Sequence, residues 1–414
     1  MTRCAPGRAA ALILVLLGAG CVDPDDDDTA AGDDDDAAGP TCFQMFRGTP
    51  ERRGHTSFTL PREQPAAGWA VNVSDLELGG GDLDWGGFPS GDTFTDEPEP
   101  YDGAMFLGGG PLTCDGLIYQ GTRGGYLTAV DAASGTIAWQ RNLQAELNGS
   151  MVLTDDHIVV GTTEEEVHLL ERRLAGRPVW AYPMHEDTLA SPALVDGVIY
   201  TSDKSGYVVA LDQATGEAIW EQQLGSTTSS SATFTPDRSL FVVAERGGPI
   251  HGFDPATGEI VWTDDTGRQV ISTAAHYGGV FYIGGWDNKL HALAEDGTPR
   301  WRFETGANIT ASPAVTEDRV FAGSWDWKVY AIDRARGEEV WSTDFGADVL
   351  GSPVWDGETL LVVSEDGGLH GVDAASGDVL WRVDMNVRSI ATPLVTEDAL
   401  YTVGVNGDLF RWDF

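Results

Sequence analysis

The sequence predicts an all-β fold: an eight-bladed β-propeller whose blades are four-stranded antiparallel sheets. Three observations predict it. A segment of the form Asp-x-x-x-Gly-x-x-x-Trp recurs along the chain, successive tryptophans lie about forty residues apart, and each unit contains four short strand-like runs separated by turn residues. Forty residues are the length of one four-stranded blade.

The tryptophan repeat has five complete copies and two degenerate ones that end at Trp180 and Trp301. In each copy the aspartate can bond backbone amides within a turn, and the glycine can adopt the left-handed conformation that ends it. One tryptophan per unit supplies a large apolar surface that can pack between neighbouring sheets. The complete copies are Asp131…Gly135…Trp139, Asp212…Gly216…Trp220, Asp254…Gly258…Trp262, Asp333…Gly337…Trp341 and Asp373…Gly377…Trp381.

Each unit predicts strands A to D in the same order. In the unit that begins at Ala311, we expect strand A at 312–315, strand B at 320–323 and strand C at 328–332. The turn from Asp333 to Gly337 then leads to strand D, which contains Trp341. These runs are short, rich in β-branched and aromatic residues, and bounded by turn residues, as expected for strands.

The count of strand A starts gives eight blades. They lie near Pro111, Met151, Pro192, Ala232, Ala274, Pro313, Pro353 and Pro393. The last unit, 392–414, ends before any strand D, whereas 68–73 reads as a strand D without a unit of its own. We therefore expect the N-terminal strand near Trp69 to complete blade eight and close the ring, which removes exposed sheet edges.

The N-terminal region predicts export. Arg3 and Arg8 precede an apolar run at 9–17 that is too short to span a bilayer, which indicates a signal peptide at 1–20. Residues 17–21, Leu-Gly-Ala-Gly-Cys, resemble a bacterial lipobox and predict lipidation of Cys21, although Gly18 stands where leucine is usual. Secretion without a lipid is the alternative. Residues 21–41 carry two aspartate runs and predict an acidic, disordered tether.

The formal net charge of −40 disfavours nucleic acid and anionic lipid surfaces as partners, because both carry negative charge. We expect a monomer that contacts the membrane through its lipid anchor alone. Cys42 and Cys114 remain once Cys4 and Cys21 are assigned to the N-terminal region, and an oxidising compartment favours one disulfide between them.

The repeat, as in the stretch from Leu211 to Trp220, resembles that of the quinoprotein-type (PQQ-like) propeller family, and 43–48 resembles its lead-in. The resemblance covers roughly 43–414 and implies the fold more strongly than the function. Quinoprotein dehydrogenases carry an adjacent cysteine pair and a calcium site. The sequence has no such pair, so we expect neither PQQ nor calcium. The other branch consists of BamB-like outer-membrane lipoproteins.

The D-to-A connections and the B-to-C turns of a propeller share one face, where the sequence departs from its repeat. The link from Trp69 to Pro111 is about thirty residues longer than its counterparts, and its insertion at 74–110 predicts a lid over the channel mouth or a mobile insertion. Trp286, Trp325 and Trp327 occupy two turns, where they either pack against the lid or bind a partner.

A polar ring is predicted at the channel entrance, five residues before each strand A position. It either holds a ligand or a cation or is simply filled with water. Its members are Glu146, Asp187, Thr227, Gln269, Asn308, Asp348 and Arg388.

No catalytic motif is found in the sequence, and the spacing of cysteines and histidines predicts no metal site. His168, His251, His291 and His370 share one position in strand C, and equivalent positions of different blades lie too far apart to share a metal. We expect them to be packing residues.

These observations favour a non-enzymatic scaffold, lipid-anchored to the outer membrane on its periplasmic or surface side, that binds a protein partner in the envelope. The BamB resemblance implies a role in outer-membrane protein assembly. The alternatives are a PQQ-dependent or other propeller enzyme and a carbohydrate-binding surface lipoprotein.

Overall fold

The computed structural model describes residues 51–54, 56–73 and 109–414. The predicted signal peptide at 1–20, the tether at 21–41, Cys21, Cys42 and the insertion from 74 to 108 lie outside the described residues. Within the described ranges, no helix is long and apolar enough to cross a membrane.

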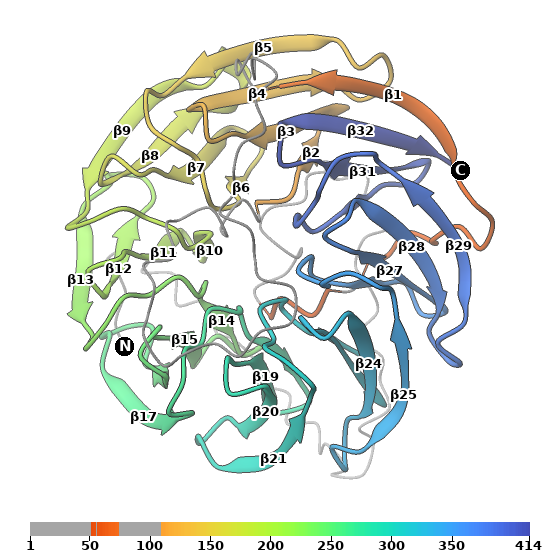
Figure 1. Cartoon of the computed structure of the whole chain (residues 1–414). Coiled ribbons are helices and arrows are strands. Elements are labelled where there is room, and N and C mark those ends of the chain that lie inside the picture. The colour runs from red at the N-terminus through yellow and green to blue at the C-terminus, as the bar shows by residue number, and fades with distance from the viewer. Residues whose placement is uncertain (1–50, 55, 74–108) are drawn as a thin grey trace, which may run out of the picture. The chain divides into compact units, whose positions relative to one another are not determined.

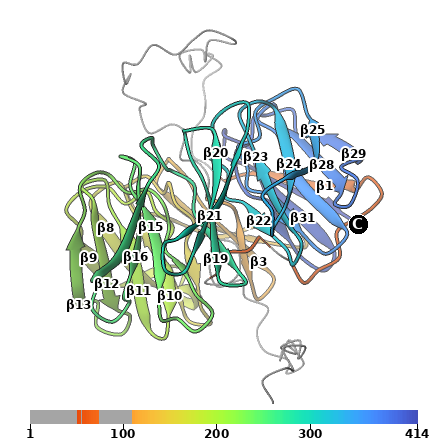
Figure 2. The ribbon, with the colours of Figure 1, turned by 90° about the horizontal axis from the view of Figure 1, so that it is seen from below.

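Eight four-stranded antiparallel sheets stand around a central axis, which confirms the predicted eight-bladed propeller (Figure 1). Figure 2 shows the ring from the side, with strands running between two faces. The strands of each blade are given in order from the centre outward. Blade one has β2 (Leu112–Cys114), β3 (Leu117–Gly121), β4 (Tyr126–Asp131) and β5 (Ile137–Asn142), and blade two has β6 (Val152–Leu153), β7 (His157–Gly161), β8 (Glu166–Glu171) and β9 (Arg177–Pro183). Blade three has β10 (Ala193–Val195), β11 (Val198–Ser202), β12 (Tyr207–Asp212) and β13 (Ala218–Gln223), and blade four has β14 (Thr233–Phe234), β15 (Phe241–Ala244), β16 (Pro249–Phe253) and β17 (Ile260–Asp265).

Blades five to eight repeat this order. Blade five has β18 (Ala275–Tyr277), β19 (Val280–Gly284), β20 (Lys289–Ala294) and β21 (Pro299–Glu304), and blade six has β22 (Ala314–Val315), β23 (Arg319–Gly323), β24 (Lys328–Asp333) and β25 (Glu339–Asp344). Blade seven has β26 (Val354–Trp355), β27 (Thr359–Val363), β28 (Gly368–Asp373) and β29 (Val379–Asp384), and blade eight has β30 (Leu394–Val395), β31 (Ala399–Val403), β32 (Asp408–Asp413) and β1 (Ala66–Asn72). A single turn of 3-10 helix, η2 (Arg172–Leu174), joins β8 to β9.

The ring closes through blade eight, as the sequence predicts. β1 pairs antiparallel with β32, with Ala66 opposite Asp413 and Asn72 opposite Asp408. Trp69 of β1 then packs against blade one, where its indole donates a hydrogen bond to the carbonyl of Ala132 (3.0 Å). The two ends of the described chain therefore hold the ring together at one blade.

The repeat tryptophans join neighbouring blades. The indole of Trp220 in blade three donates to the carbonyl of Pro255 in the C-to-D turn of blade four (2.8 Å). Gly258 ends that turn at φ +74°, and a Cβ there would come within 2.6 Å of the Trp220 ring. The glycine is therefore required twice, by its left-handed backbone and by the stacked indole. The same donation joins Trp180 to Gln213, Trp262 to Glu295, Trp301 to Arg334 and Trp341 to Ala374.

Blade eight has no C-to-D turn of this kind, and an N-terminal strap (residues 51–54 and 56–65) takes its place. The indole of Trp381 in blade seven donates to the carbonyl of Pro61 (2.7 Å). Leu60 is buried beside it, and its amide donates to Asp356 (2.5 Å). The strap thus supplies the backbone carbonyl that accepts the Trp381 indole, a role that the C-to-D turn of the next blade has for the indoles named above.

Candidate functional site

The D-to-A connections and the B-to-C turns bond to each other on one face, which we call the mouth. In each of blades two to eight, the second residue of the B-to-C turn donates its amide to the carbonyl of a predicted ring residue. The pairs, donor first, are Thr163–Glu146, Lys204–Asp187, Arg246–Thr227, Trp286–Gln269, Trp325–Asn308, Glu365–Asp348 and Val405–Arg388, at 2.7 to 3.2 Å. The seven predicted residues therefore share one face with seven turn residues.

Several mouth side chains form ion pairs with each other. Lys204 pairs with Asp187 (2.6 Å), and Arg123 of the blade-one turn pairs with Glu146 (3.5 Å). Arg388 pairs with Glu365. Sequence reasoning missed Lys204, Arg123 and Glu365. Their shared position, second in the B-to-C turn, was the signal that could have identified them.

Two of the three predicted tryptophans pack on each other. The rings of Trp286 and Trp325 lie 5.7 Å apart between centroids at an angle of 60°, and both side chains are half-buried. The Trp325 indole also donates to the hydroxyl of Thr310 (2.9 Å). These contacts explain how two bulky side chains are tolerated in turns; any contact with the insertion falls outside the described residues.

Trp327 is different, because half of its side chain is exposed and its backbone is left-handed (φ +71°). The fourth position of the B-to-C turn is left-handed in every blade, and in five blades it is glycine. The eight residues are Gly125, Glu165, Gly206, Gly248, Asn288, Trp327, Gly367 and Gly407. A bulky aromatic residue is disfavoured in this conformation by about 1 kcal/mol. Strain of this kind concentrates at functional positions.

The side chain of Asp348 lies next to that of Trp327, within hydrogen-bonding distance of the indole. Burial raises the pKa of the Asp348 carboxyl, while a hydrogen bond from Trp327 and the charge of Arg388 oppose that rise. Trp327 thus presents an exposed aromatic surface whose polar edge is already held by a mouth residue. An exposed, positioned tryptophan is the residue type most often found as an interface hot spot.

The strand C histidines hold the B-to-C turns. His251 bonds Glu245 (2.6 Å) and His291 bonds Asp287 (3.1 Å), in each case within the turn of its own blade. At the same position His370 bonds Ser364 (3.0 Å) and Tyr330 donates to Asp326 (2.5 Å). His168 lies 3.1 Å from Glu166. The predicted packing residues therefore also position the turns that form the mouth.

A cavity of about 110 Å³ lies in the central channel. None of the seven predicted ring residues lines it. Its lining comes from residues two and four positions further along each connection, because alternate side chains of these extended segments point inward. The first tier is Asn148, Leu189, Ser229, Ile271, Thr310, Leu350 and Ile390; the second includes Ser191, Ser231, Thr273, Ser312, Ser352 and Thr392.

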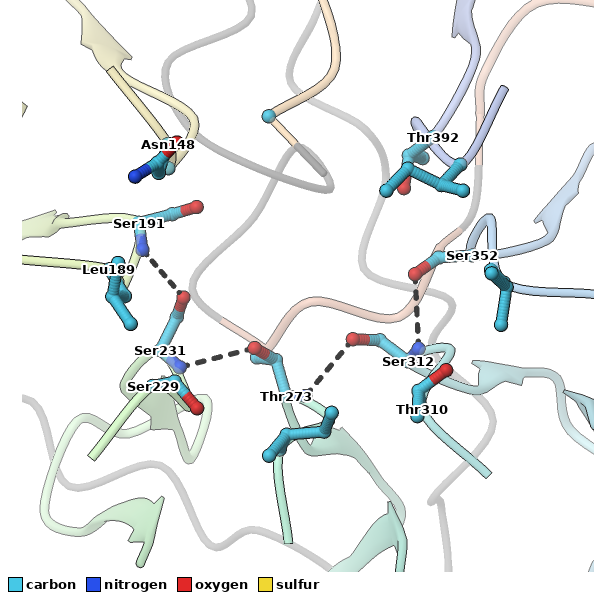
Figure 3. Close-up of a pocket in the computed structure, with 15 residues that line it drawn as sticks. Asn148, Leu189, Ser191, Ser229, Ser231, Thr273, Thr310, Ser312, Ser352 and Thr392 are labelled. Carbon is cyan, nitrogen blue, oxygen red and sulfur yellow. Dashed lines mark hydrogen bonds between the residues drawn. The ribbon is translucent and has the colours of Figure 1, made fainter. Parts of the chain in front are cut away.

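The second tier forms a belt of hydroxyls that joins neighbouring blades (Figure 3). In five of them, all but Thr392, the hydroxyl accepts the backbone amide of the equivalent residue in the preceding blade. The bonds run from Ser150 to Ser191, Ser191 to Ser231, Ser231 to Thr273, Thr273 to Ser312 and Ser312 to Ser352, at 2.9 to 3.1 Å. Serine or threonine is therefore needed at these positions for a structural reason.

The strap fills the channel next to this belt. The carbonyls of Glu51 and Arg53 accept the amides of His276 and Val315, on the innermost strands of blades five and six. Arg52 between them is fully buried, and its guanidinium donates to the carbonyls of Ala232 (2.8 Å) and Pro192 (3.3 Å). Burial lowers the pKa of Arg52 to about 9. The strap thus reaches from blades five and six to blades three and four and closes the channel at this level.

In residues 51–54, 56–73 and 109–414, no group of three or more histidine, cysteine or acidic side chains is arranged to hold a metal ion. Cys114 is fully buried in β2. Cys42 lies outside the described residues, so the predicted Cys42–Cys114 disulfide stays a prediction.

Known proteins share this architecture. Over 247 residues the chain is 22% identical to outer membrane protein assembly factor BamB of Yersinia pestis, covering 54% of this chain and 61% of that protein. It is 27% identical over 232 residues to a quinohemoprotein alcohol dehydrogenase of Comamonas testosteroni, covering 51% of this chain and 28% of that enzyme. The chain thus matches less than two thirds of the length of either relative.

The crystal structure of BamB from Moraxella catarrhalis superimposes with a TM-score of 0.64 at 21% identity, covering 72% of this chain and 94% of that one. At this identity the likeness shows the shared fold. The profile of the family described as outer membrane protein assembly factor BamB matches residues 67–239, 204–307, 246–335 and 287–413, which together span most of the chain. The chain therefore belongs to the family of outer membrane protein assembly factor BamB.

Proposed function

We propose that this protein is a non-enzymatic scaffold of the bacterial envelope, lipid-anchored through Cys21, that binds a protein partner of outer-membrane assembly with its mouth. Family membership supports the assembly role, and the lipobox-like segment at 17–21 supports the anchor. The observation that carries the proposal is Trp327, half-exposed in a left-handed turn position that most blades give to glycine.

The strain at Trp327 argues for binding because the contacts of its side chain within the described part of the fold are few: one hydrogen bond to Asp348, with half of the side chain left exposed. A glycine at this turn position would relieve the strained backbone, and it is what five other blades have. A half-exposed tryptophan also leaves apolar surface in water. Both unfavourable terms are offset if the indole is buried against a partner, which makes Trp327 the expected anchor of the interface.

The PQQ-dependent alternative fits the channel poorly. PQQ carries several carboxylates, whereas no side chain that lines the cavity is cationic. Burying an uncompensated charge there would be strongly unfavourable. We therefore propose that the chain binds no PQQ and has no dehydrogenase activity, so that addition of PQQ and calcium yields no dye reduction with alcohols.

Site-specific photo-cross-linking tests the partner proposal. A benzoylphenylalanine at position 327 is compared with one at position 174. Leu174 is similarly exposed (52% against 50%), but it lies on the C-to-D connection, at the opposite face. We expect position 327 to capture an outer-membrane assembly protein in native membranes, and position 174 to capture none.

Cross-links of equal yield at both positions, or at 174 alone, would contradict the proposal. A second measurement removes dependence on the probe: Trp327→Gly should reduce co-purification of the same partner at least fivefold while the variant remains folded. Undiminished co-purification would place the interface elsewhere.

A further inference from the structure

The central cavity combines three properties of a small-molecule site. It lies on the channel axis with a volume of about 110 Å³, which limits it to a small ligand; all the described residues that line it are uncharged; and strap residues fill the channel beside its hydroxyl belt. A concave cavity with a few convergent polar groups is the usual form of a ligand site. The identity of the polar groups decides which ligand it fits.

Two polar atoms in the first tier lack a hydrogen-bond partner. Asn148 and Ser229 are 5% and 7% exposed, and both line the cavity. Asn148 Oδ1 and Ser229 Oγ are buried without any hydrogen bond. An unpaired buried polar atom is unfavourable by about 1–3 kcal/mol, so such atoms normally have a partner. Since no partner comes from the described part of the chain, a ligand or bound water is expected to supply it.

From blade two to blade seven, polar and apolar side chains alternate in the first tier, and Ile390 of blade eight adds a further apolar side chain. Asn148, Ser229 and Thr310 come from blades two, four and six, while Leu189, Ile271 and Leu350 come from blades three, five and seven. The Thr310 hydroxyl accepts the Trp325 indole and retains its own hydrogen to donate. The tier thus presents three polar points separated by apolar surface.

We propose that this cavity binds a small neutral polyol, either free or as the end of a glycan. Hydroxyl groups can donate to Asn148 Oδ1 and exchange hydrogen bonds with Ser229 and Thr310, and the carbon chain can pack against Ile271 and Leu350. An anionic analogue should bind more weakly, because none of the described residues that line the cavity is cationic and the guanidinium of Arg52 beside the belt already bonds backbone carbonyls. The site is separate from the proposed partner interface at Trp327 and does not depend on it.

Binding is measured on the full-length protein by saturation-transfer NMR with three probes: glycerol, methyl α-D-glucopyranoside and glycerol 3-phosphate. We expect a neutral probe to bind and the phosphate to bind more weakly or not at all. Glycerol alone identifies a free polyol, whereas the glucoside alone identifies a glycan end.

The variants Asn148→Leu and Ser229→Ala each remove one unpaired atom. Each should weaken binding about tenfold without destabilising the fold, since each also removes an unsatisfied buried group. Trp327→Gly is the matched control and should leave polyol affinity unchanged. Absence of binding by both neutral probes, equal binding of the phosphate, or undiminished binding by both cavity variants would overturn the proposal.

Discussion

The two faces of the propeller are built by different rules. On the face of the C-to-D turns, an indole from one blade bonds the turn of the next, with the same glycine beneath it from blade to blade. At the mouth, the second turn position is arginine, threonine, lysine, arginine, tryptophan, tryptophan, glutamate and valine in successive blades. The backbone bonds between turns and connections repeat there, whereas the side chain at this second turn position does not. Residues that repeat from blade to blade therefore make the contacts that hold the ring together, and the residues that differ between blades form the surface that is available for recognition.

The largest expected effect is at the regular face. Trp301→Ala removes the indole that bonds Arg334 and covers Gly337. We expect a loss of about 3–5 kcal/mol in the free energy of unfolding, since a large packed side chain is deleted. Urea denaturation measures it. The mouth substitution Trp286→Ala is the control, with a loss nearer 1 kcal/mol, because it removes mainly one aromatic pair. Equal losses of unfolding free energy in Trp301→Ala and Trp286→Ala would contradict the distinction between the two faces.

The pH dependence of stability comes next. Burial, with a smaller contribution from the charge of Arg382, lowers the pKa of His370 to about 4 from an ordinary value of 6.5. Between these values the unfolded chain binds more protons than the native one, so stability falls as pH falls from about 7 to 4, by up to about 3 kcal/mol. His370→Gln should lose less stability over that range. The exposed His185→Gln should behave as wild type; an identical slope for all three proteins would refute the assignment.

The third prediction concerns the hydroxyl belt, a contact that repeats between blades near the mouth and that we expect to stabilise the fold. Ser312→Ala leaves the amide of Thr273 without its acceptor (3.1 Å). We expect a loss of about 1–2 kcal/mol, the penalty of an unpaired buried group. Ser376→Ala, on an exposed turn, is the control and should change stability by less. Thermal unfolding compares them, and a neutral Ser312→Ala would remove the belt from the contacts that hold the ring.

The smallest expected effect has the opposite sign. Trp327→Gly relieves a left-handed backbone and should stabilise the fold by about 1 kcal/mol. Gly367→Trp at the equivalent turn position of blade seven is the converse substitution and should destabilise. Denaturation midpoints of both variants check this, and destabilisation by Trp327→Gly would mean that the tryptophan serves folding instead of recognition.

The sequence alone determined the blade count and the way the ring closes. Each blade is one stretch of about forty residues, so the spacing of the tryptophans from Trp139 to Trp381 counts the blades directly. The single strand around Trp69 supplies the strand that the last unit lacks, which shows where the ring closes. It also placed Trp286, Trp325 and Trp327 in turns on one face, because strand alternation fixes which turns share a face.

Tertiary structure decided the rest. The residues that line the channel lie two and four positions after the predicted ring residues. The ring residues instead bond a B-to-C turn about seventeen residues further along the chain, and these bonds set how each connection enters the channel. The strap's insertion of Arg52 among the carbonyls of blades three and four joins residues 140 and 180 positions apart. The left-handed backbone of Trp327 goes against the conformational preference of tryptophan and is imposed by the turn that all eight blades share. Contacts between distant segments set the path of the strap and the level at which each connection enters the channel.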